Sequence, residues 1–201
     1  MCKHRSMILK HSKIDLTIEQ LHAKSFIHFI AELQNLLNYI GKHLQALHQT
    51  VSIAESVTAG FLQFSFSQMK DASEFFKGGL TVYSYDEKIN LLNIDREEVI
   101  RENGISHNIA KQMALNVAEL YQTDWSIAVT GYSSPVKESD QKLFAYFSIS
   151  YAGKILLTER LDLHSRTMPL KAQMYYSEFI LGCFKLELDK MTEIENERMS
   201  S

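Results

Sequence analysis

The stretch "SIAESVTAG", residues 52–60, joins a run typical of a buried strand to a group of small residues. β-branched residues are frequent in residues 50–54, as they are in strands generally, and the run stops at Glu55 and Ser56. Residues 60–70 then carry apolar side chains at positions that suit a helix. We therefore interpret the stretch as a strand that ends in two polar residues and leads into a helix.

Further elements follow this strand and helix. Residues 71–79, "DASEFFKGG", are interpreted as a loop, because consecutive glycines mark a backbone that turns or closely approaches another group. Residues 80–94 begin as a strand and end as a helical turn. Ser106 is in position to cap a helix over residues 107–121. We expect one face of that helix to carry Ile109, Met113, Val117 and Leu120.

Residues 125–131, "WSIAVTG", are typical of a second buried strand, which ends in Thr130 and Gly131. Residues 143–163 favour a hairpin that turns at Ala152 and Gly153. The chain then continues to about Asp189 as a helix with one apolar face.

The order of these elements predicts an α/β fold, a three-layer α/β/α sandwich with a mixed sheet. We expect a single domain over residues 34–190, an N-terminal helical extension over residues 1–33, and a polar tail over residues 191–201. In the extension, a capping box formed by Thr17 and Gln20 precedes an apolar stripe.

Composition narrows the class of protein. The 201 residues include 45% apolar and 22% charged residues, which is typical of a soluble globular chain. A net charge of −3 provides no field that would attract nucleic acid, and no segment approaches the roughly 20 apolar residues that span a membrane. Two cysteines cannot build a disulfide framework, which favours a reducing compartment. We expect a cytoplasmic protein without nucleic-acid or membrane partners.

Ser56 admits two interpretations. Ligands of open α/β sheets bind outside the carboxyl ends of the strands, where Ser56 and Thr130 are predicted to lie. Serine at such a position is commonly a helix cap. Alternatively it is a nucleophile, and the amides of residues 57–59 hold the oxyanion that its attack creates.

A serine nucleophile requires a base within hydrogen-bond reach. None of the eight histidines falls at a predicted strand end, and the sequence contains no HExxH or CxxC metal pattern. A lysine whose pKa is lowered can take the place of histidine. The segment "YSYDEK" offers a phenol, Tyr83, close to an amine, Lys88.

Four segments together resemble the C-terminal domain of the competence/damage-inducible CinA proteins, which also occurs alone as nicotinamide mononucleotide deamidase. They are "AESVTAG", "FFKGGLTVYSYDEKINLLNI", "NGISHNIAKQMA" and "DWSIAVTG". The family pattern is approximately AESCTGG, then GGxxxYSNEAKxxLLGV, then GAVSxxVAxxMA, then TGIAGP. The resemblance extends over residues 34–188 with the order and spacing preserved.

The resemblance implies hydrolysis of the carboxamide of nicotinamide mononucleotide to nicotinate mononucleotide and ammonia, without a metal or another cofactor. It implies Ser56 as the nucleophile and Tyr83 and Lys88 as its catalytic partners. The substrate, a small nucleotide, is then expected to contact a further set of residues, namely Thr58, Gly79, Thr130, Gly131 and Arg166.

The chain departs from the family pattern around the substrate. Val57 replaces a cysteine and Ala59 a glycine, and "TGYSSPVKE" loses several glycines of the corresponding loop. Arg166 matches an arginine that could meet a phosphate, but Leu170 and Lys171 stand where further arginines usually follow.

Two functions are therefore open: an active amidase, or an inactive family member that binds a nucleotide or a protein. Convergence of Ser56, Tyr83 and Lys88 around an open pocket would favour the enzyme. Residues 1–33 pack either on the domain or on a second subunit, and we prefer a homo-oligomer.

Overall fold

The computed structural model describes residues 31–200, with side chains through residue 194. The chain divides into two compact units, residues 1–36 and residues 37–201. The predicted capping box at Thr17 and Gln20, with most of the expected extension, lies outside the described residues. Among the described residues, no helix is both long and apolar enough to cross a membrane.

The second unit contains a five-stranded mixed sheet, as predicted, with strand order β2-β1-β3-β4-β5. Strand β1 is parallel to β2 and to β3, whereas β4 is antiparallel to both β3 and β5. The strands are β1 (Val51–Glu55), β2 (Phe76–Thr81), β3 (Trp125–Gly131), β4 (Leu143–Tyr151) and β5 (Lys154–Leu163). Because β1, β2 and β3 are parallel, their carboxyl ends meet at one edge of the sheet.

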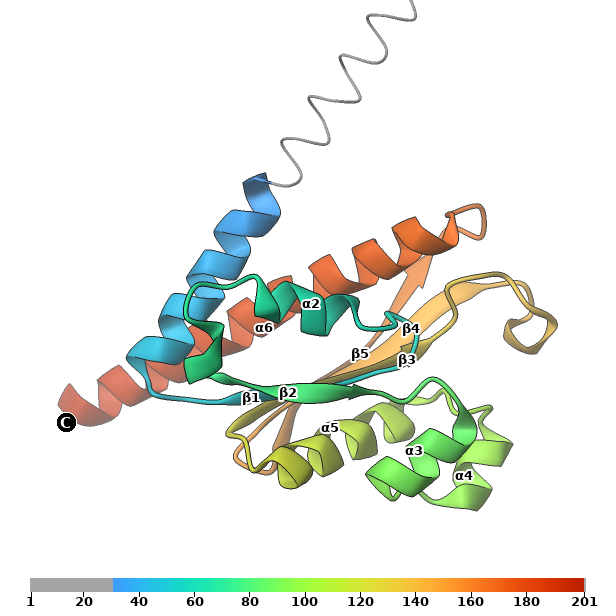
Figure 1. The fold of residues 1–201 in the computed structure, drawn as a ribbon, viewed down its shortest axis with the longest axis horizontal. Coiled ribbons are helices and arrows are strands. Elements are labelled where there is room, and N and C mark those ends of the chain that lie inside the picture. Colours follow the sequence, from blue (N-terminus) through green and yellow to red (C-terminus); the bar gives the residue numbers. More distant parts are fainter. Residues whose placement is uncertain (1–30, 201) are drawn as a thin grey trace, which may run out of the picture. The chain divides into compact units, whose positions relative to one another are not determined.

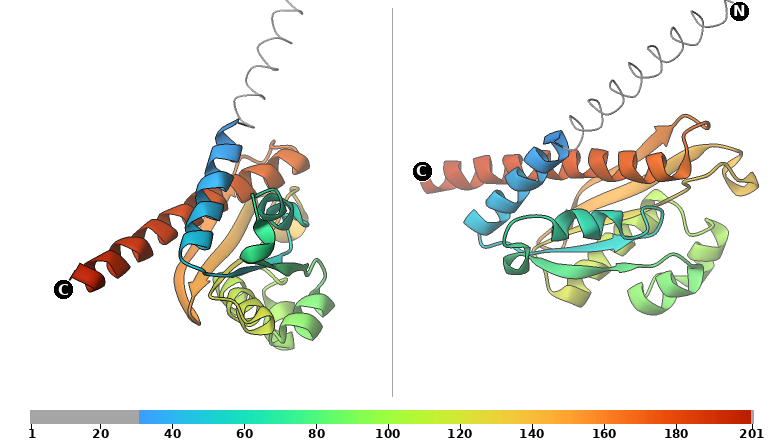
Figure 2. Two further views of the ribbon diagram at one scale, coloured as in Figure 1. Left: turned by 60° about the vertical axis from the view of Figure 1, so that its left-hand side comes forward. Right: turned by 45° about the horizontal axis from the view of Figure 1, so that its top comes forward.

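Helices cover both faces of this sheet, which confirms the predicted three-layer arrangement. They are α2 (Phe61–Ser67), α3 (Tyr85–Leu92), α4 (Arg96–Arg101), α5 (His107–Tyr121) and α6 (Pro169–Ser200). Helices α3, α4 and α5 lie on one side of the sheet, and α2 and α6 lie on the other (Figure 1). The two further views agree on this division (Figure 2).

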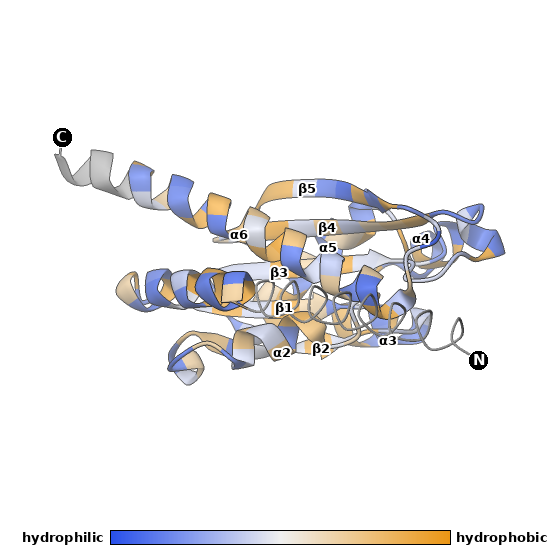
Figure 3. Ribbon diagram, turned by 90° about the horizontal axis from the view of Figure 1, so that it is seen from above, coloured by the Kyte–Doolittle hydropathy of each residue, from blue (hydrophilic) through white to orange (hydrophobic). Residues whose placement is uncertain are grey.

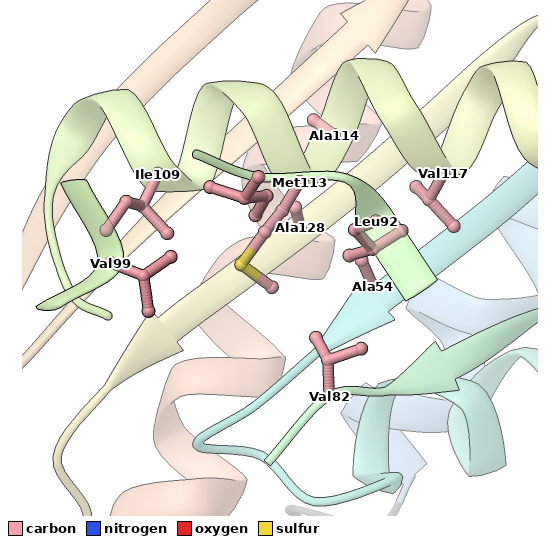
Figure 4. Close-up of a cluster of buried hydrophobic side chains, with 10 residues drawn as sticks. Ala54, Val82, Leu92, Val99, Ile109, Met113, Ala114, Val117 and Ala128 are labelled. Carbon is pink, nitrogen blue, oxygen red and sulfur yellow. The ribbon is translucent and has the colours of Figure 1, made fainter. Parts of the chain in front are cut away.

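The core beneath α5 depends on small strand residues. Ala54 of β1 and Ala128 of β3 are fully buried against Met113 of α5 and its neighbours (Figure 4). Two strand serines reinforce the contact, because Ser126 Oγ donates to the Ala114 carbonyl at 2.6 Å and Ser52 Oγ donates to the Val117 carbonyl at 3.2 Å. Helix α5 is thus fixed along the strands that form the site, and its predicted cap is confirmed, since Ser106 Oγ accepts from the amide of Ile109.

The opposite face is packed by aromatic side chains. Trp125 is fully buried, lies edge-on to Phe184 of α6 and donates from its indole nitrogen to Gln49 at 2.7 Å. Apolar and polar segments alternate along α6 (Figure 3), as expected of a helix that buries one face. Its buried residues include Tyr176, Ile180, Phe184 and Leu188, spaced as one helical stripe.

The hairpin between β4 and β5 was correctly predicted to turn at Ala152 and Gly153. Both residues adopt left-handed backbone angles, with φ of 48° and 73°. Two consecutive left-handed residues give the turn whose twist matches that of the flanking strands.

Three details of the predicted elements are wrong. Gly78 and Gly79 lie within β2, which begins at Phe76, and not in a loop. Leu120 is 55% exposed, because the buried face of α5 continues from Val117 and Ala118 toward Tyr121. Helix α6 extends to Ser200, whereas the sequence had indicated an end near Asp189 and a polar tail.

Gly79 is required by the packing of the sheet. A Cβ at this position would lie 2.4 Å from the carbonyl oxygen of Ile53 in the adjacent β1. We expect Gly79→Ala to lower the free energy of unfolding by about 1–3 kcal/mol, because the neighbouring backbone must shift. Gly182 in α6 has nothing within 4 Å of the corresponding position, so Gly182→Ala should be neutral or stabilise by roughly 0.5–1 kcal/mol. Urea denaturation of both variants measures this difference, and equal stability of Gly79→Ala and Gly182→Ala would contradict the prediction.

Candidate active site

A cavity of about 260 Å³ opens at the edge of the sheet where the parallel strands end. The strand ends are held together there, because the amide of Ser56 donates to the carbonyl of Val129 at 3.0 Å. The lining comes from the segments that follow β1, β2 and β3 and from the loop before α5. It consists of Ser56, Val57, Tyr83, Tyr85, Lys88, Asn103, Ile105, Gly131, Tyr132, Ser133, Ser134 and Val136.

Lys88 and Ser56 are in direct contact in this cavity. Lys88 Nζ donates to Ser56 Oγ at 2.9 Å and to the carbonyl oxygen of Val82, also at 2.9 Å. Both side chains are buried, with 2% of Lys88 and 6% of Ser56 exposed. Helix α3 carries the lysine into place, since Ser84 caps its first turn by accepting from the amide of Glu87. The structure thus brings together two of the three predicted catalytic residues.

Burial lowers the pKa of Lys88 from its ordinary value of 10.5 to about 8. The cause is desolvation, which disfavours the charged ammonium form. Because the Val82 carbonyl can only accept, it fixes the direction of one N–H bond. When the side chain is a neutral amine, its lone pair remains available to the Ser56 hydroxyl.

Glu55 is the residue that organises the turn after β1. Its side chain is fully buried, and Oε2 accepts from Thr58 Oγ1 at 2.6 Å and from the amides of Gly60 and Leu62 at 3.1 Å each. Oε1 accepts from the amide of Gln63 at 2.8 Å. The carboxylate therefore satisfies the first amides of α2, which otherwise lack partners within the helix.

These bonds exclude one of the two interpretations of Ser56. Helix α2 begins at Phe61 with Gly60 at its N-cap, so the interpretation of Ser56 as a helix cap is wrong. Of the three amides expected to hold an oxyanion, that of Ala59 donates to the Ser56 carbonyl at 3.1 Å. Among the bonds within residues 31–200, the amides of Val57 and Thr58 have no acceptor. Only those two remain as oxyanion donors from this turn.

The remaining predicted residues are divided by the structure. Tyr83, 67% exposed, and Gly131 both line the cavity. Thr58 is buried outside the lining and donates to Glu55. Thr130 is also buried outside it and donates from Oγ1 to the Gly104 carbonyl at 2.7 Å, which holds the loop before α5 in place.

Gly79 and Arg166 lie away from the lining. Gly79 pairs with Ile53 in the sheet, and its carbonyl accepts from the hydroxyl of Tyr121 at 3.1 Å. Arg166 is exposed in the turn between β5 and α6, where its amide donates to His164 Nδ1 at 3.1 Å. Their assignment to substrate binding remains a prediction, and neither residue contributes to the lining of the cavity.

Val57 and Ala59, the two departures from the family pattern in this turn, differ in whether they line the cavity. Val57 lines the cavity, and its carbonyl accepts from Gln173 of α6 at 3.0 Å. Ala59 adopts a left-handed φ of 51°, which costs a non-glycine residue about 1–2 kcal/mol. Its side chain is exposed, however, so the added Cβ does not crowd the cavity.

Sequence reasoning missed Glu55, Tyr85 and Tyr132. A carboxylate directly before a helix start was a usable signal for Glu55, because helix N-termini favour negative charge. Tyr85 lies within the segment "YSYDEK" and begins α3, and Tyr132 directly follows β3, but a sequence pattern does not define which side chains line a cavity. Among the described residues, no three His, Cys, Asp or Glu side chains form a group that could hold a metal ion.

Comparisons with known proteins agree on one family. Residues 33–174 match the model of the CinA C-terminal domain. A CinA-like protein from Trichodesmium erythraeum is 37% identical over 109 residues, which are 54% of this chain and 26% of the relative. One from Gloeothece citriformis is 37% identical over 112 residues, which are 56% of this chain and 27% of the relative. The matched region is thus about a quarter of the length of these curated relatives.

Solved structures share the fold. A CinA superfamily protein from Klebsiella pneumoniae superposes with a TM-score of 0.72 at 21% identity, and the match covers 79% of this chain and 98% of the other. A CinA superfamily protein from Enterobacter cloacae gives a TM-score of 0.72 at 23% identity, covering 78% of this chain and 92% of the other. At these identities the likeness establishes the fold alone.

The role of Glu55 can be tested by its removal. Glu55→Ala leaves two buried and two half-buried donors without their acceptor, and we expect it to lower the free energy of unfolding by at least about 2 kcal/mol. Glu55→Gln retains one acceptor oxygen and should lose less. The exposed Glu74, whose carboxylate accepts from Gln45 at 3.3 Å, provides the control Glu74→Ala, expected within about 0.5 kcal/mol of the native protein. If Glu55→Ala is as stable as Glu74→Ala in urea denaturation, Glu55 does not stabilise the turn after β1.

Proposed function

The chain belongs to the CinA C-terminal domain family, and on that premise we propose that it is a serine amidase. The reaction we propose is hydrolysis of the carboxamide of nicotinamide mononucleotide to nicotinate mononucleotide and ammonia. The observation that carries the proposal is the 2.9 Å contact between Lys88 Nζ and Ser56 Oγ, buried at the base of an open cavity. Two cysteines in the whole chain suit the cytoplasm as its location.

The first half of the reaction forms an acyl-enzyme. Lys88, as the neutral amine, accepts the proton of Ser56 Oγ while this oxygen attacks the carboxamide carbon. The direct contact favours transfer straight to the amine over a route through the phenol of Tyr83. The amides of Val57 and Thr58 are available to the developing oxyanion, at a contribution of about 3 kcal/mol for each well-placed donor.

Ammonia leaves as the acyl-enzyme forms, and the second half of the reaction releases the acid. The ammonium of Lys88 donates its proton to the departing nitrogen, which leaves as ammonia when the carbon–nitrogen bond breaks. Lys88 is then an amine again and accepts a proton from water as the water attacks the ester on Ser56. Collapse of this second intermediate returns the proton to Ser56 Oγ and frees the nicotinate product. Tyr83, at the exposed mouth of the same cavity, is assigned a contact with the bound substrate.

An inactive protein that binds a nucleotide or a partner is the alternative function. Such a protein has no physical need for a desolvated lysine beside a serine, since burial of a charge costs stability that a binding role would not recover. The contact between these two residues therefore supports the enzyme.

Ammonia release from nicotinamide mononucleotide tests the proposal. We expect Ser56→Ala and Lys88→Met each to lower kcat/KM by at least about a thousandfold, because each removes a member of one acting unit. Ser67→Ala and Lys77→Ala change exposed residues of the same types and should leave it unchanged. A Ser56→Ala variant that keeps most of the activity would contradict the assignment.

The pH dependence follows from the pKa of Lys88. The amine is the base, so kcat/KM should rise with pH and level off above an apparent pKa of about 8. Measurement between pH 6 and pH 10 would show a rising limb that Lys77→Ala does not alter. Activity that falls with rising pH in this interval would exclude Lys88 as the base.

A further inference from the structure

The cavity is lined by phenol rings and carries little positive charge. Tyr83, Tyr85 and Tyr132 all contribute to the lining. Among the described lining residues, Lys88 is the one basic side chain, and its nitrogen is already held by Ser56 and Val82. The other polar side chains of the lining are serines and one asparagine, Asn103.

Two features that could bind a phosphate, the start of α2 and Arg166, do not face the cavity with a free positive group. The first amides of α2 are occupied by the carboxylate of Glu55. Arg166, the residue expected to meet a phosphate, is exposed in the turn before α6 and does not contribute to the lining. Hence neither the start of α2 nor an arginine of the described residues contributes positive charge to the lining.

The size of the cavity agrees with this view. Its volume of about 260 Å³ lies just below the range of roughly 300–1,000 Å³ that is usual for pockets enclosing a drug-sized ligand. An aromatic ring with a carboxamide fits such a space.

The surroundings favour a positively charged ring. The faces of aromatic rings carry partial negative charge and attract cations. Burial raises the pKa of the Tyr132 phenol, with smaller contributions from Tyr85 and from Glu138 in the short helix Lys137–Ser139, which adds negative charge near this ring. Tyr132 is itself held by α6, because Tyr176 donates from its hydroxyl to the Tyr132 carbonyl at 3.0 Å.

We propose that the cavity selects an aromatic cation bearing a carboxamide, through the rings of Tyr83, Tyr85 and Tyr132, and leaves the phosphate of a nucleotide substrate in solvent. The inference rests on the proposed function, since it concerns the same site. It defines the recognised group as an N-substituted pyridinium carboxamide, whether the substituent is a methyl group, a ribose or a ribose phosphate.

The test compares ammonia release from nicotinamide mononucleotide, nicotinamide riboside, 1-methylnicotinamide and uncharged nicotinamide. We expect kcat/KM for the riboside within about fivefold of that for the mononucleotide, because a solvent-exposed phosphate contributes little. Nicotinamide should be at least about tenfold poorer than 1-methylnicotinamide, since it lacks the charge. A mononucleotide preferred more than about tenfold over the riboside would overturn the inference and leave the amidase intact.

A binding measurement separates the two proposals. If none of the four compounds releases ammonia, the proposed function fails, and calorimetry with the native protein decides the inference. We expect 1-methylnicotinamide to bind at least about tenfold more tightly than nicotinamide, a preference that Tyr132→Phe retains and Tyr132→Leu loses. Equal binding of the two compounds, or a preference unaffected by Tyr132→Leu, would overturn it.

Discussion

The buried contact between Lys88 and Ser56 is the constraint on which the site depends. Enclosing the lysine lowers its pKa from 10.5 to about 8, which corresponds to about 3 kcal/mol against the charged form. Below pH 8 both the folded and the unfolded chain bind the proton, so the fold bears this cost in full. Between pH 8 and pH 10.5 the unfolded chain binds more protons, and the contribution of Lys88 to stability improves as pH rises. Burial of Lys88 thus lowers the stability of the fold and makes the neutral amine form accessible near pH 8.

Glu55 explains why the first strand ends in a glutamate and a serine. The carboxylate turns back toward α2 and accepts from its first amides, while the next residue, Ser56, faces Lys88. One residue fixes the turn, and the other contacts the buried lysine. As a result, the negative charge at the helix start belongs to the protein itself, and the site must bind its substrate by other means.

Much of this arrangement follows from the sequence, and the exceptions have physical causes. Parallel strands with polar ends and the turn at Ala152 and Gly153 could be predicted, because local pattern and backbone preference determine them. Gly78 and Gly79 were misinterpreted, because paired glycines usually indicate a loop. Here both lie in a strand, where the close approach of β1 requires Gly79 and a φ of 120° favours glycine at position 78. The distance between Lys88 and Ser56 could not be derived from pattern alone, since it depends on how α3 packs below the sheet. It was expected only through a resemblance.

The most direct test of the account is the titration of Lys88 itself. Lysine labelled with ¹³C at the ε position reports its own protonation by NMR, and the signal of Lys88 is identified by its loss in Lys88→Met. We predict a midpoint near pH 8 for Lys88, well below the ordinary lysine value of 10.5. A midpoint for Lys88 at pH 10 or above would mean that the amine form is not available, and would contradict a serine activated by this lysine.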